Sequence, residues 1–413
     1  MLFPPSNPNC AARRVVVTGA GIITALGNGW RTNAEGFRAG RKAFRPVTLF
    51  DVSRQRAKSA AEADLPASLP TTKLTARQTA RQDRAAKLLL VAAHEALSES
   101  GWEPAEKLPL ILGTTSGGMT LGEDYLRQAL KFPKCDRRQA TRSVHYQVQQ
   151  QGADVCAAFG LGGPVTIIAN ACASGANAIG HGWQLVRKGH ADRVLAGGYE
   201  ALCQLVFCGF DSLQALSPTQ CRPFAAERDG LALGEGAALL ALEPLEHAQK
   251  RGAEILGEIT GYGAVTDTHH IAQPHPLGNA AYGAMMAACV SAGICPEQVD
   301  YVNAHGTGTP LNDSSEAAAI NRWAGARAAT LPVSSTKAGV GHMLGAAGAV
   351  EAIVCLMALR EQWLPPQIGS PEADPVCQFP LVRQPADARV RTVLSNSFGF
   401  GGANAALIMK EWS

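Results

Sequence analysis

A single cysteine, Cys172, stands where an apolar run ends and a run of small residues begins. The apolar run at 165–169 predicts a buried strand, and residues 173–176 predict the start of a helix. A thiol at a helix N-terminus is close to backbone N–H donors and to the positive end of the helix dipole, and both favour the thiolate. The small neighbours leave room for a substrate. The segment indicates a nucleophile that forms a covalent intermediate, and a buried structural cysteine is the alternative.

Two histidines lie in glycine-rich turns that follow predicted strands. His305 belongs to NAHGTGTPLND, and His342 belongs to SSTKAGVGHMLGAAGAVEA, together with Lys337 and Glu351. A neutral imidazole can donate a hydrogen bond to a developing oxyanion, and a nearby lysine or carboxylate decides its protonation state. The last glycine loop, SNSFGFGGAN, could direct a backbone N–H toward the cysteine and complete an oxyanion hole. These residues together indicate acyl transfer.

Alternating strands and helices must position these residues, and they predict an α/β protein with parallel sheets covered on both faces. We expect a strand at 15–18 followed by a glycine turn and a helix, and further helices at 75–100, 279–292 and 345–359. The 413 residues exceed one ordinary core. We predict two similar halves, residues 1–262 with Cys172 and residues 263–413 with the histidines.

Composition excludes several classes of function. A net charge of +3 does not indicate nucleic acid or a membrane surface, and no apolar run approaches the roughly 18 residues of a membrane span. The eleven scattered cysteines include no CxxC pair, which favours a reducing cytoplasm and no zinc site. The glycines after the first strand match a dinucleotide fingerprint poorly. His269, His270 and His275 have no further ligand at suitable spacing, so no metal is predicted.

Four segments carry a resemblance to the elongating (type I/II) β-ketoacyl-acyl carrier protein synthases. They are ACASG, NAHGTGTP, STKAGVGHMLGAAGAVE and NSFGFGGAN, and the resemblance extends from about Arg14 to Lys410. It implies a thiolase-like, five-layered α/β/α/β/α sandwich of two similar halves. It also implies decarboxylative Claisen condensation of a cysteine-bound acyl chain with malonyl-acyl carrier protein, which releases CO₂ and extends the chain by two carbons. No cofactor is implied beyond the carrier's phosphopantetheine.

The resemblance also implies a role for each matching residue. Cys172 would be the nucleophile, His305 and His342 would hold the malonyl thioester, and Lys337 and Glu351 would organise the histidines. Other matching residues would form the gate, whose backbone N–H joins that of the cysteine in the oxyanion hole (Phe400), and contact the substrate (Thr307, Thr309, Ser116 and Phe398). Asp313 and Glu316 would be structural. An acidic carrier protein would dock on basic residues, namely Arg77, Arg81, Arg137, Arg138 and Arg222.

Two departures from the family leave the pathway open. Ser116 stands where a bulkier aliphatic residue is common, and glutamines occupy positions 147 and 149–151. The glutamines indicate an exposed helix face, a polar or unsaturated acyl chain, or a non-identical partner. Fatty-acid synthesis and type II polyketide or polyene synthesis therefore both remain, with a homodimer or a heterodimer with a chain-length-factor-like homologue.

Other members of the superfamily fit less well. A thiolase would carry a second cysteine in the last glycine loop, and an initiating type III synthase would use Cys-His-Asn. A non-catalytic or chain-length-setting partner subunit is the alternative function, and the intact Cys172, His305 and His342 argue against it.

Overall fold

The two halves of the chain repeat one strand arrangement. The computed structural model describes residues 12–103, 107–131, 145–369 and 372–412. The first half arranges its strands in the order β6-β5-β7-β8-β1, and the second half arranges its strands in the order β11-β10-β14-β15-β9. If these five strands of each half are numbered in chain order, both halves arrange them as 3-2-4-5-1. The parallel and antiparallel pairings also correspond. The predicted similarity of the halves is confirmed.

The strands that come before Cys172, His305 and His342, which are β6, β10 and β11, are short. The strands of the first half are β1 (Val15–Thr24), β5 (Leu110–Gly113), β6 (Val165–Ile168), β7 (Val194–Glu200) and β8 (Gly236–Pro244). Those of the second half are β9 (Gly257–Thr266), β10 (Tyr301–Asn303), β11 (Val333–Ser334), β14 (Thr392–Phe398) and β15 (Ala403–Lys410). The halves join where the start of β1 pairs with β9. The division after residue 262 stays a prediction.

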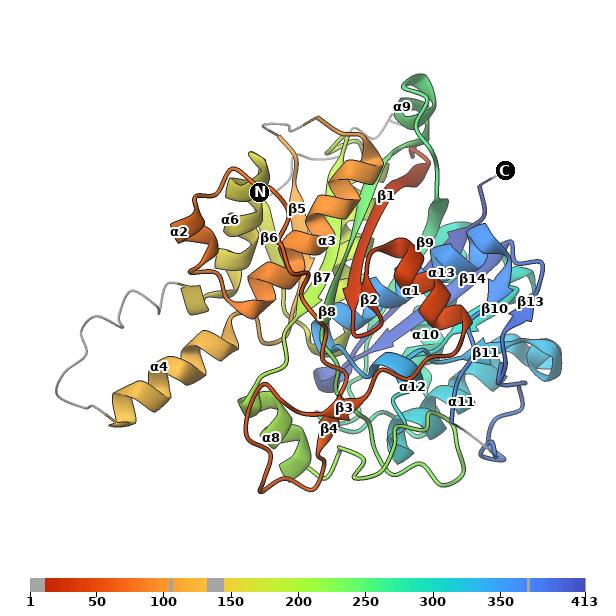
Figure 1. Cartoon of the computed structure of the whole chain (residues 1–413). Helices are drawn as coiled ribbons and strands as arrows, with labels where there is room; N and C mark the ends of the chain where they lie inside the picture. The colour runs from red at the N-terminus through yellow and green to blue at the C-terminus, as the bar shows by residue number, and fades with distance from the viewer. Residues whose placement is uncertain (1–11, 104–106, 132–144, 370–371, 413) are drawn as a thin grey trace.

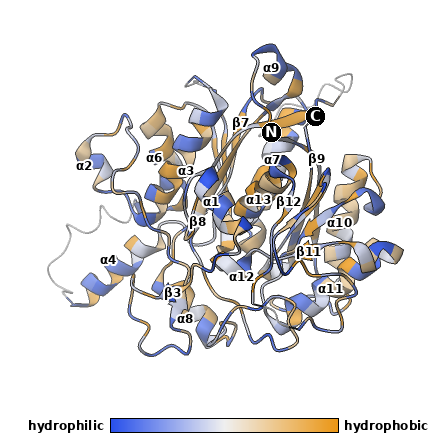
Figure 2. Cartoon of the chain, turned by 45° about the vertical axis from the view of Figure 1, so that its right-hand side comes forward, coloured by the Kyte–Doolittle hydropathy of each residue, from blue (hydrophilic) through white to orange (hydrophobic). Residues whose placement is uncertain are grey.

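Two helices lie between the sheets and others cover the outer faces. The central pair is α7 (Ser174–Arg187) and α13 (Ala347–Glu361), which pack against each other and against strands of both halves (Figures 1 and 2). One outer face carries α3 (Arg84–Ser100) and α6 (Val148–Phe159), and the other carries α10 (Asn279–Ala292) and α11 (Pro310–Ala324). Residues 347–359 of α13 are all buried, as expected of a helix that is apolar around its circumference except at Glu351. The predicted five-layered sandwich is confirmed.

The glycines near the N-terminus do not make the predicted turn. β1 continues through Gly19 and Gly21 to Thr24. A Cβ atom at Gly19 would lie 2.3 Å from the carbonyl oxygen of Ala96, and one at Gly21 would lie 1.9 Å from that of Ala92. The glycines are therefore needed because α3 crosses the strand at backbone distance. The expected strand–turn–helix at this point is wrong.

The predicted helix at 75–100 is also wrong, because the chain forms two helices there. The first, α2 (Ala76–Thr79), has a capping box made by Thr75 and Gln78. The second, α3, begins after Asp83, whose carboxylate accepts a hydrogen bond from the Ala86 N–H at 2.7 Å. The expected helix at 279–292 coincides with α10, and that at 345–359 is a 3₁₀ turn, η5 (Leu344–Ala346), followed by α13.

Shorter elements complete the described chain. α4 (Met119–Lys131) projects from the body in Figure 1, and α8 (Gln204–Ser212) lies below the first sheet in that view. The remaining helices are α1 (Trp30–Arg38), η2 (Ala171–Ala173), α9 (Leu245–Lys250), η3 (Pro296–Gln298), η4 (Gly325–Thr330), α12 (Lys337–Val340) and η6 (Phe400–Gly402). The small strands are β2 (Gly27–Asn28), β3 (Arg45–Pro46), β4 (Ser59–Ala60), β12 (Trp363–Leu364) and β13 (Ala386–Asp387). Within the described ranges, none of the helices has the length and apolar character needed to cross a bilayer.

Candidate active site

Cys172 lies in the tight turn between β6 and α7. The preceding residue, Ala171, has a φ of 56°, a left-handed value that costs energy for a residue with a side chain. The hydroxyl of Ser174 donates to the Ala171 carbonyl at 2.5 Å and accepts from the Asn170 N–H at 3.0 Å. These bonds hold the turn so that the cysteine precedes the first turn of α7, as the sequence predicts.

Burial outweighs the helix terminus in setting the charge of this thiol. Cys172 is 7% exposed and packs in an apolar cluster with Leu202 and Leu344. The pKa of Cys172 is raised to about 12, mainly by desolvation; Lys337 opposes the rise, and Glu200 and Glu351 add to it. The free protein therefore holds a thiol here at neutral pH, whereas the sequence led us to expect a thiolate.

His305 and Lys337 form a buried cluster with Glu351. The Lys337 ammonium donates to the carbonyl oxygen of His305 at 2.6 Å and to a carboxylate oxygen of Glu351, and it lies 3.4 Å from His305 Nδ1. The side chains of Lys337 and Glu351 are 1% and 2% exposed. The predicted network is therefore assembled around one ammonium group, and it directs the Nε2 edge of His305 away from Lys337.

His342 faces His305 across the same space. The two ring centroids are 5.2 Å apart and the ring planes are nearly perpendicular. The backbone of His342 is fixed by a hydrogen bond to the Ala232 carbonyl at 2.7 Å and by one from the Gly234 N–H at 3.0 Å. Neither ring nitrogen of His342 has a hydrogen-bond partner among the described residues. No described protein group therefore competes with a substrate for the imidazole of His342.

Both imidazoles are held neutral. Burial lowers the pKa of His305 well below its usual value, and Lys337 and His342 lower it further. Burial and Lys337 likewise hold the pKa of His342 well below the usual range. With Lys337 at its Nδ1, neutral His305 carries its proton on Nε2 and can donate from there.

Two buried carboxylates shape the loop that carries His305. Glu316 accepts from the N–H groups of His305 and Gly306 at 2.8 and 2.7 Å. Asp313 accepts from the Thr307 N–H at 3.0 Å and from the Gly308 N–H. Asn396 also donates to Glu316 and Asn312 to Asp313, so both carboxylates are held mainly by the loop, which supports the structural role expected for them.

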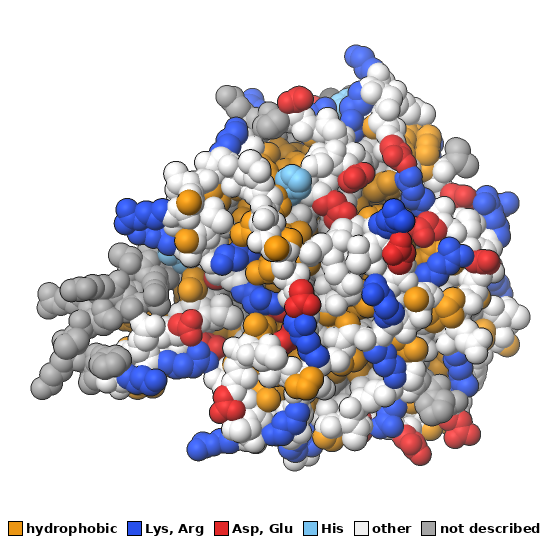
Figure 3. All heavy atoms as spheres, in the orientation of Figure 1, with side chains coloured by type: hydrophobic (Ala, Val, Ile, Leu, Met, Phe, Trp, Pro, Cys, Tyr) orange, Lys and Arg blue, Asp and Glu red, His pale blue; other side chains and the backbone are white. Residues whose placement is uncertain are grey.

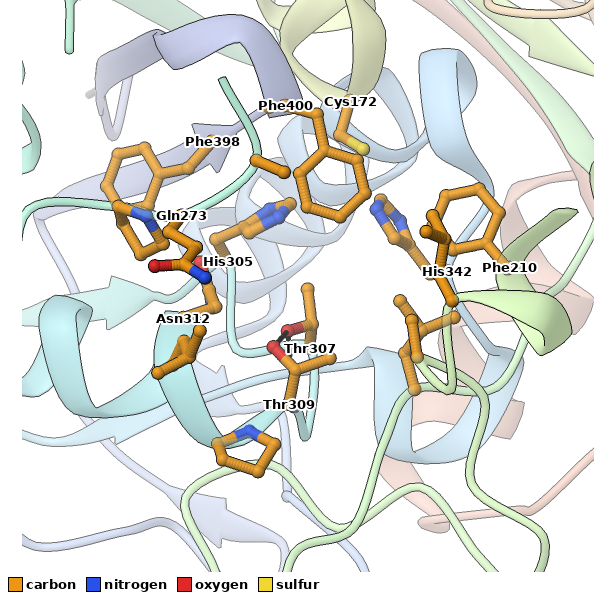
Figure 4. Close-up of a pocket in the computed structure, with 18 of the residues that line it drawn as sticks. Cys172, Phe210, Gln273, His305, Thr307, Thr309, Asn312, His342, Phe398 and Phe400 are labelled. Carbon is orange, nitrogen blue, oxygen red and sulfur yellow. Dashed lines mark hydrogen bonds between the residues drawn. The ribbon is translucent and has the colours of Figure 1, made fainter. Parts of the chain in front are cut away.

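Cys172, His305 and His342 line one pocket of about 420 Å³, whereas Lys337, Glu351, Asp313 and Glu316 are not part of its lining. Figure 4 shows Cys172, His305 and His342 close together in the buried part of the pocket, here called its inner end, with Thr307 and Thr309 below them in that view. The hydroxyl groups of the two threonines are 2.9 Å apart. Phe398 lines the pocket as well, with its ring 5.7 Å from that of His305. The structure thus brings together most of the residues that the sequence singles out.

Phe400 covers the cysteine, and residues missed by the sequence reading support it. Its ring stacks on that of Phe210 with centroids 5.9 Å apart. The loop that contains Phe400 is tied to a second loop, because the Gly401 N–H donates to the Ile271 carbonyl at 2.7 Å. A Cβ at Gly399 would lie 3.0 Å from the backbone nitrogen of Cys172, so this loop contacts the nucleophile's N–H directly. Phe210 carries no local motif that could have identified it.

The mouth of the pocket is rich in exposed apolar side chains. Four large ones line it: Leu213, Ile271, Leu311 and Phe400, which are 70%, 77%, 56% and 45% exposed. Gln273 and Asn312 add two carboxamides (Figure 4). No lysine or arginine is among the described residues that line the pocket. The sequence reading did not single out these rim residues.

Other predicted site residues do not line this pocket. Ser116 is 3% exposed and its hydroxyl donates to Glu200, so it is not part of the pocket lining. Arg77 and Arg81 are exposed on and after α2, which lies apart from α8 and α11 in Figures 1 and 2. Arg222 lies beside the pocket lining, because a Cβ at Gly308 would be 3.2 Å from its backbone nitrogen, and its side chain pairs with Asp229 at 3.6 Å. Arg137 and Arg138 lie outside the described residues.

Hydrogen bonds explain two of the glutamines at positions 147 and 149–151. Gln151 is buried and donates to Asp83 at 3.1 Å and to the His145 carbonyl at 3.0 Å. Gln150 donates to Asp154 within α6 at 2.8 Å, and positions 147 and 149 are exposed. Neither the glutamines nor Ser116 line the described pocket, so they give no support to a polar acyl pocket.

The chain is similar to known proteins over most of its length. The model of the beta-ketoacyl synthase N-terminal domain matches residues 12–248, and that of the C-terminal domain matches residues 256–370. The 3-oxoacyl-[acyl-carrier-protein] synthase 2 of Synechocystis sp. is 37% identical, over 98% of this chain and 99% of that protein.

Solved structures give the same picture. The ishigamide ketosynthase/chain length factor superposes with a TM-score of 0.90 and 33% identity, covering 98% of this chain and 100% of the other. A type II PKS ketosynthase solved with its acyl-carrier protein, bound to a hexaketide, matches with a TM-score of 0.86 and 28% identity, covering 97% and 100%.

Proposed function

The chain belongs to the beta-ketoacyl synthase family, and on this premise we propose that its pocket carries out decarboxylative Claisen condensation. The substrates are an acyl chain held on Cys172 and malonyl-acyl carrier protein, and the products are a 3-oxoacyl-carrier protein two carbons longer and CO₂. One observation carries the proposal: Cys172 and two buried, neutral histidines line the inner end of one pocket. This combination suits a thioester whose carbonyl oxygen becomes negative.

In the first half-reaction the Cys172 sulfur attacks the acyl thioester and the carrier's pantetheine thiol leaves. The thiol must give up its proton as it attacks, because burial keeps it protonated in the free protein. A neutral imidazole at the same end of the pocket is the available acceptor, and the proton then goes to the leaving pantetheine sulfur. Cysteine suits the step because its thiolate can later act as a leaving group.

In the second half-reaction His305 and His342 hold the malonyl thioester oxygen. When the bond to the carboxyl group breaks, CO₂ leaves and the electron pair forms an enolate on that oxygen. Nε2–H of His305 is directed to donate because Lys337 occupies its Nδ1 side. His342 has no competing partner among the described residues. Neutral donors stabilise the enolate without protonating its carbon.

The enolate carbon then attacks the acyl-cysteine carbonyl and the Cys172 thiolate is released. The negative oxygen of the tetrahedral intermediate needs backbone donors. The N–H of Cys172 and that of Phe400 are proposed for this task, since the Gly399 backbone contacts the cysteine nitrogen. The released thiolate recovers a proton, and the kinetics are ping-pong.

The carrier protein is proposed to deliver its pantetheine arm through the mouth of the pocket. The arm has amides and a hydroxyl, and the Thr307 and Thr309 hydroxyls line the path. The exposed side chains of Leu213, Ile271 and Leu311 surround the opening and can be covered by a docked protein. The solved relative that binds its acyl-carrier protein supports this assignment of partner.

A second subunit is proposed at the edge of the first sheet. β6 is the last strand of that sheet and its residues are only half-buried. Tyr125, Leu126 and Leu130 on α4 are exposed. An edge strand and an apolar helix face are both expected to be covered in an assembly. The subunit is an identical chain or a homologue, as in the ketosynthase/chain length factor pair named above.

The scheme needs no cofactor beyond the carrier-bound pantetheine, because the cysteine, the imidazoles and two backbone N–H groups supply its donors and acceptors. We place the reaction in the cytoplasm, in type II fatty-acid or polyketide synthesis. The choice between these pathways stays open, because Ser116 and the glutamines do not line the pocket.

The test is intact-protein mass spectrometry after incubation with acyl-carrier thioesters, saturated and polyunsaturated. We expect an acyl adduct on the wild type that is absent from Cys172→Ala, and 3-oxoacyl product after malonyl-carrier protein is added. The chain type that forms the adduct fastest identifies the pathway. Product formed by Cys172→Ala at the wild-type rate would overturn the assignment of the nucleophile.

A further inference from the structure

The end of strand β7 holds a buried carboxylate to which no catalytic role is assigned above. Glu200 is 1% exposed. It accepts from the N–H groups of Thr115 and Ser116, each at 2.8 Å, and from the Gly345 N–H at 2.9 Å. The Ser116 hydroxyl donates to it too. Among the described residues no lysine, arginine or histidine pairs with Glu200, so backbone N–H groups and hydroxyls alone hold the carboxylate.

The donors come from both halves of the chain. Thr115 and Ser116 belong to the turn after β5, whereas Gly345 belongs to the segment that begins with His342 and leads into α13, which carries Glu351. Glu200 therefore links the first sheet directly to the segment that bears a pocket histidine.

Glycines let the same segments approach at backbone distance. A Cβ at Gly345 would lie 2.5 Å from the Thr114 carbonyl carbon, and one at Gly113 would lie 2.3 Å from that of Ser174. A Cβ at Gly175 would lie 2.7 Å from the Gly345 carbonyl oxygen. The start of α7, the turn after β5 and the segment after His342 are thus packed backbone to backbone. A small change in the position of the segments that Glu200 holds would therefore move Cys172 relative to His342.

We propose that Glu200 is a positioning residue that fixes His342 against Cys172. Its carboxylate accepts from Gly345, which follows Leu344, and Leu344 packs in one cluster with Cys172, so we expect the charge of Glu200 also to oppose thiolate formation. The inference rests on the proposed function only for its effect on turnover. Every described hydrogen bond to Glu200 comes from a donor, so a carboxylate suits the site. The NH₂ group of an amide would instead be placed against an N–H or O–H donor. Glu200 adds to the effect of burial on the pKa of Cys172. The other titratable groups in this region are Lys337, Glu351, His305, His342, Tyr199, Cys203 and Glu123.

Three variants separate the two roles. Glu200→Gln should lower kcat at least about tenfold with KM little changed, since misplacement by a fraction of an ångström impairs transition-state contacts. It should also move the pH profile of Cys172 alkylation by iodoacetamide to lower pH by about one unit, because a neighbouring negative charge is lost. Glu200→Asp should lower kcat without moving that profile. Glu243→Gln, which changes a buried carboxylate on β8 held by Arg251 and Thr18, should change only stability.

The alkylation is followed on the Cys172 peptide and needs no carrier substrate. A shift in folded Glu200→Gln therefore supports the electrostatic role even if the wild type failed to condense its substrates, which would count against the proposed function alone. An unshifted profile in folded Glu200→Gln would overturn that role. If Glu200→Gln does not fold, Glu200→Asp with wild-type kcat would overturn the positioning role.

Discussion

The inner end of the pocket and its mouth are built by opposite means. At the inner end Cys172, His305 and His342 are at most 7% exposed, and each is fixed by buried neighbours or backbone hydrogen bonds. At the mouth Leu213, Ile271 and Leu311 are more than half exposed. Bond-making groups need positions defined to a fraction of an ångström, whereas a surface that binds and releases a carrier protein needs apolar area that is free between encounters.

The difference predicts how each region responds to mutation. A substitution at the inner end should lower both stability and kcat, because the groups there are desolvated and mutually dependent. A substitution at the mouth should change only the interaction with the carrier.

The largest effect is expected from Lys337→Met. It leaves the buried Glu351 carboxylate without its partner, so the free energy of unfolding should fall by about 3–5 kcal/mol. The His305 ring loses the ammonium that orients it, so kcat should fall at least about 100-fold. Urea denaturation and steady-state condensation assays measure the two quantities.

The double variant Lys337→Met/Glu351→Gln is the matched control. It contains no unpaired buried charge, so much of the stability should return while kcat stays low. Recovery of kcat together with stability would show that the pair only supports the fold. Catalysis at the inner end would then not depend on the Lys337–Glu351 pair.

The sequence predicted the inner end because its residues lie in local motifs. The glycine-rich turns around Cys172, His305 and His342 each follow a strand, and parallel strands bring such turns to one edge. The mouth could not be predicted this way. The stack of Phe210 on Phe400 joins residues far apart in the sequence, and the exposure of Leu213 depends on which loops converge.

Local patterns also misled where tertiary contacts decide. Gly19 and Gly21 read as a turn, but they are strand residues that let α3 cross. Ser116 read as a pocket residue, but its hydroxyl donates to Glu200. Glu200 itself carries no signal in the sequence, because only the fold brings the turn after β5 and Gly345 to its carboxylate.

An intermediate effect is expected in the pH dependence of stability. The pKa values of His305 and His342 are lower in the folded protein than the unfolded value of 6.5. Below pH 6.5 the unfolded chain therefore binds more protons than the folded one, and stability falls as pH falls, by about 1.4 kcal/mol per pH unit for each histidine. His342→Gln should remove one such contribution.

The comparison must be made between the wild type and His342→Gln at each pH. Glu316, whose pKa is raised to about 7, and Asp83, whose pKa is raised to about 6, act in the opposite direction, because their folded forms bind protons more readily than the unfolded chain. These contributions cancel in the difference between the two proteins. Equal slopes from pH 6 to pH 5 in urea denaturation would mean that His342 is not held neutral.

The smallest effects are expected at the mouth. Leu213→Ser and Leu311→Ser should each raise KM for the carrier-bound substrate about fivefold, which corresponds to the loss of about 1 kcal/mol of apolar contact. The melting temperature and the rate with a small acyl thioester should change little. Val290→Ser is the matched control, since Val290 is 76% exposed on α10 and does not line the pocket.

Arg77→Ala sets this apolar mouth against the basic docking surface predicted from the sequence. Basic and acidic side chains are intermixed over the face shown in Figure 3, and α2 lies apart from the helices around the pocket. We therefore expect less than about a twofold rise in KM, the usual scale for an exposed charge at physiological salt. A larger effect for Arg77→Ala than for the leucine variants would place the carrier on the basic surface and separate docking from the mouth. The reverse order would mean that the carrier docks on the same surface through which it delivers the pantetheine arm. The exposed leucines would then be its contacts, and the buried histidines would lie at the inner end of the pocket.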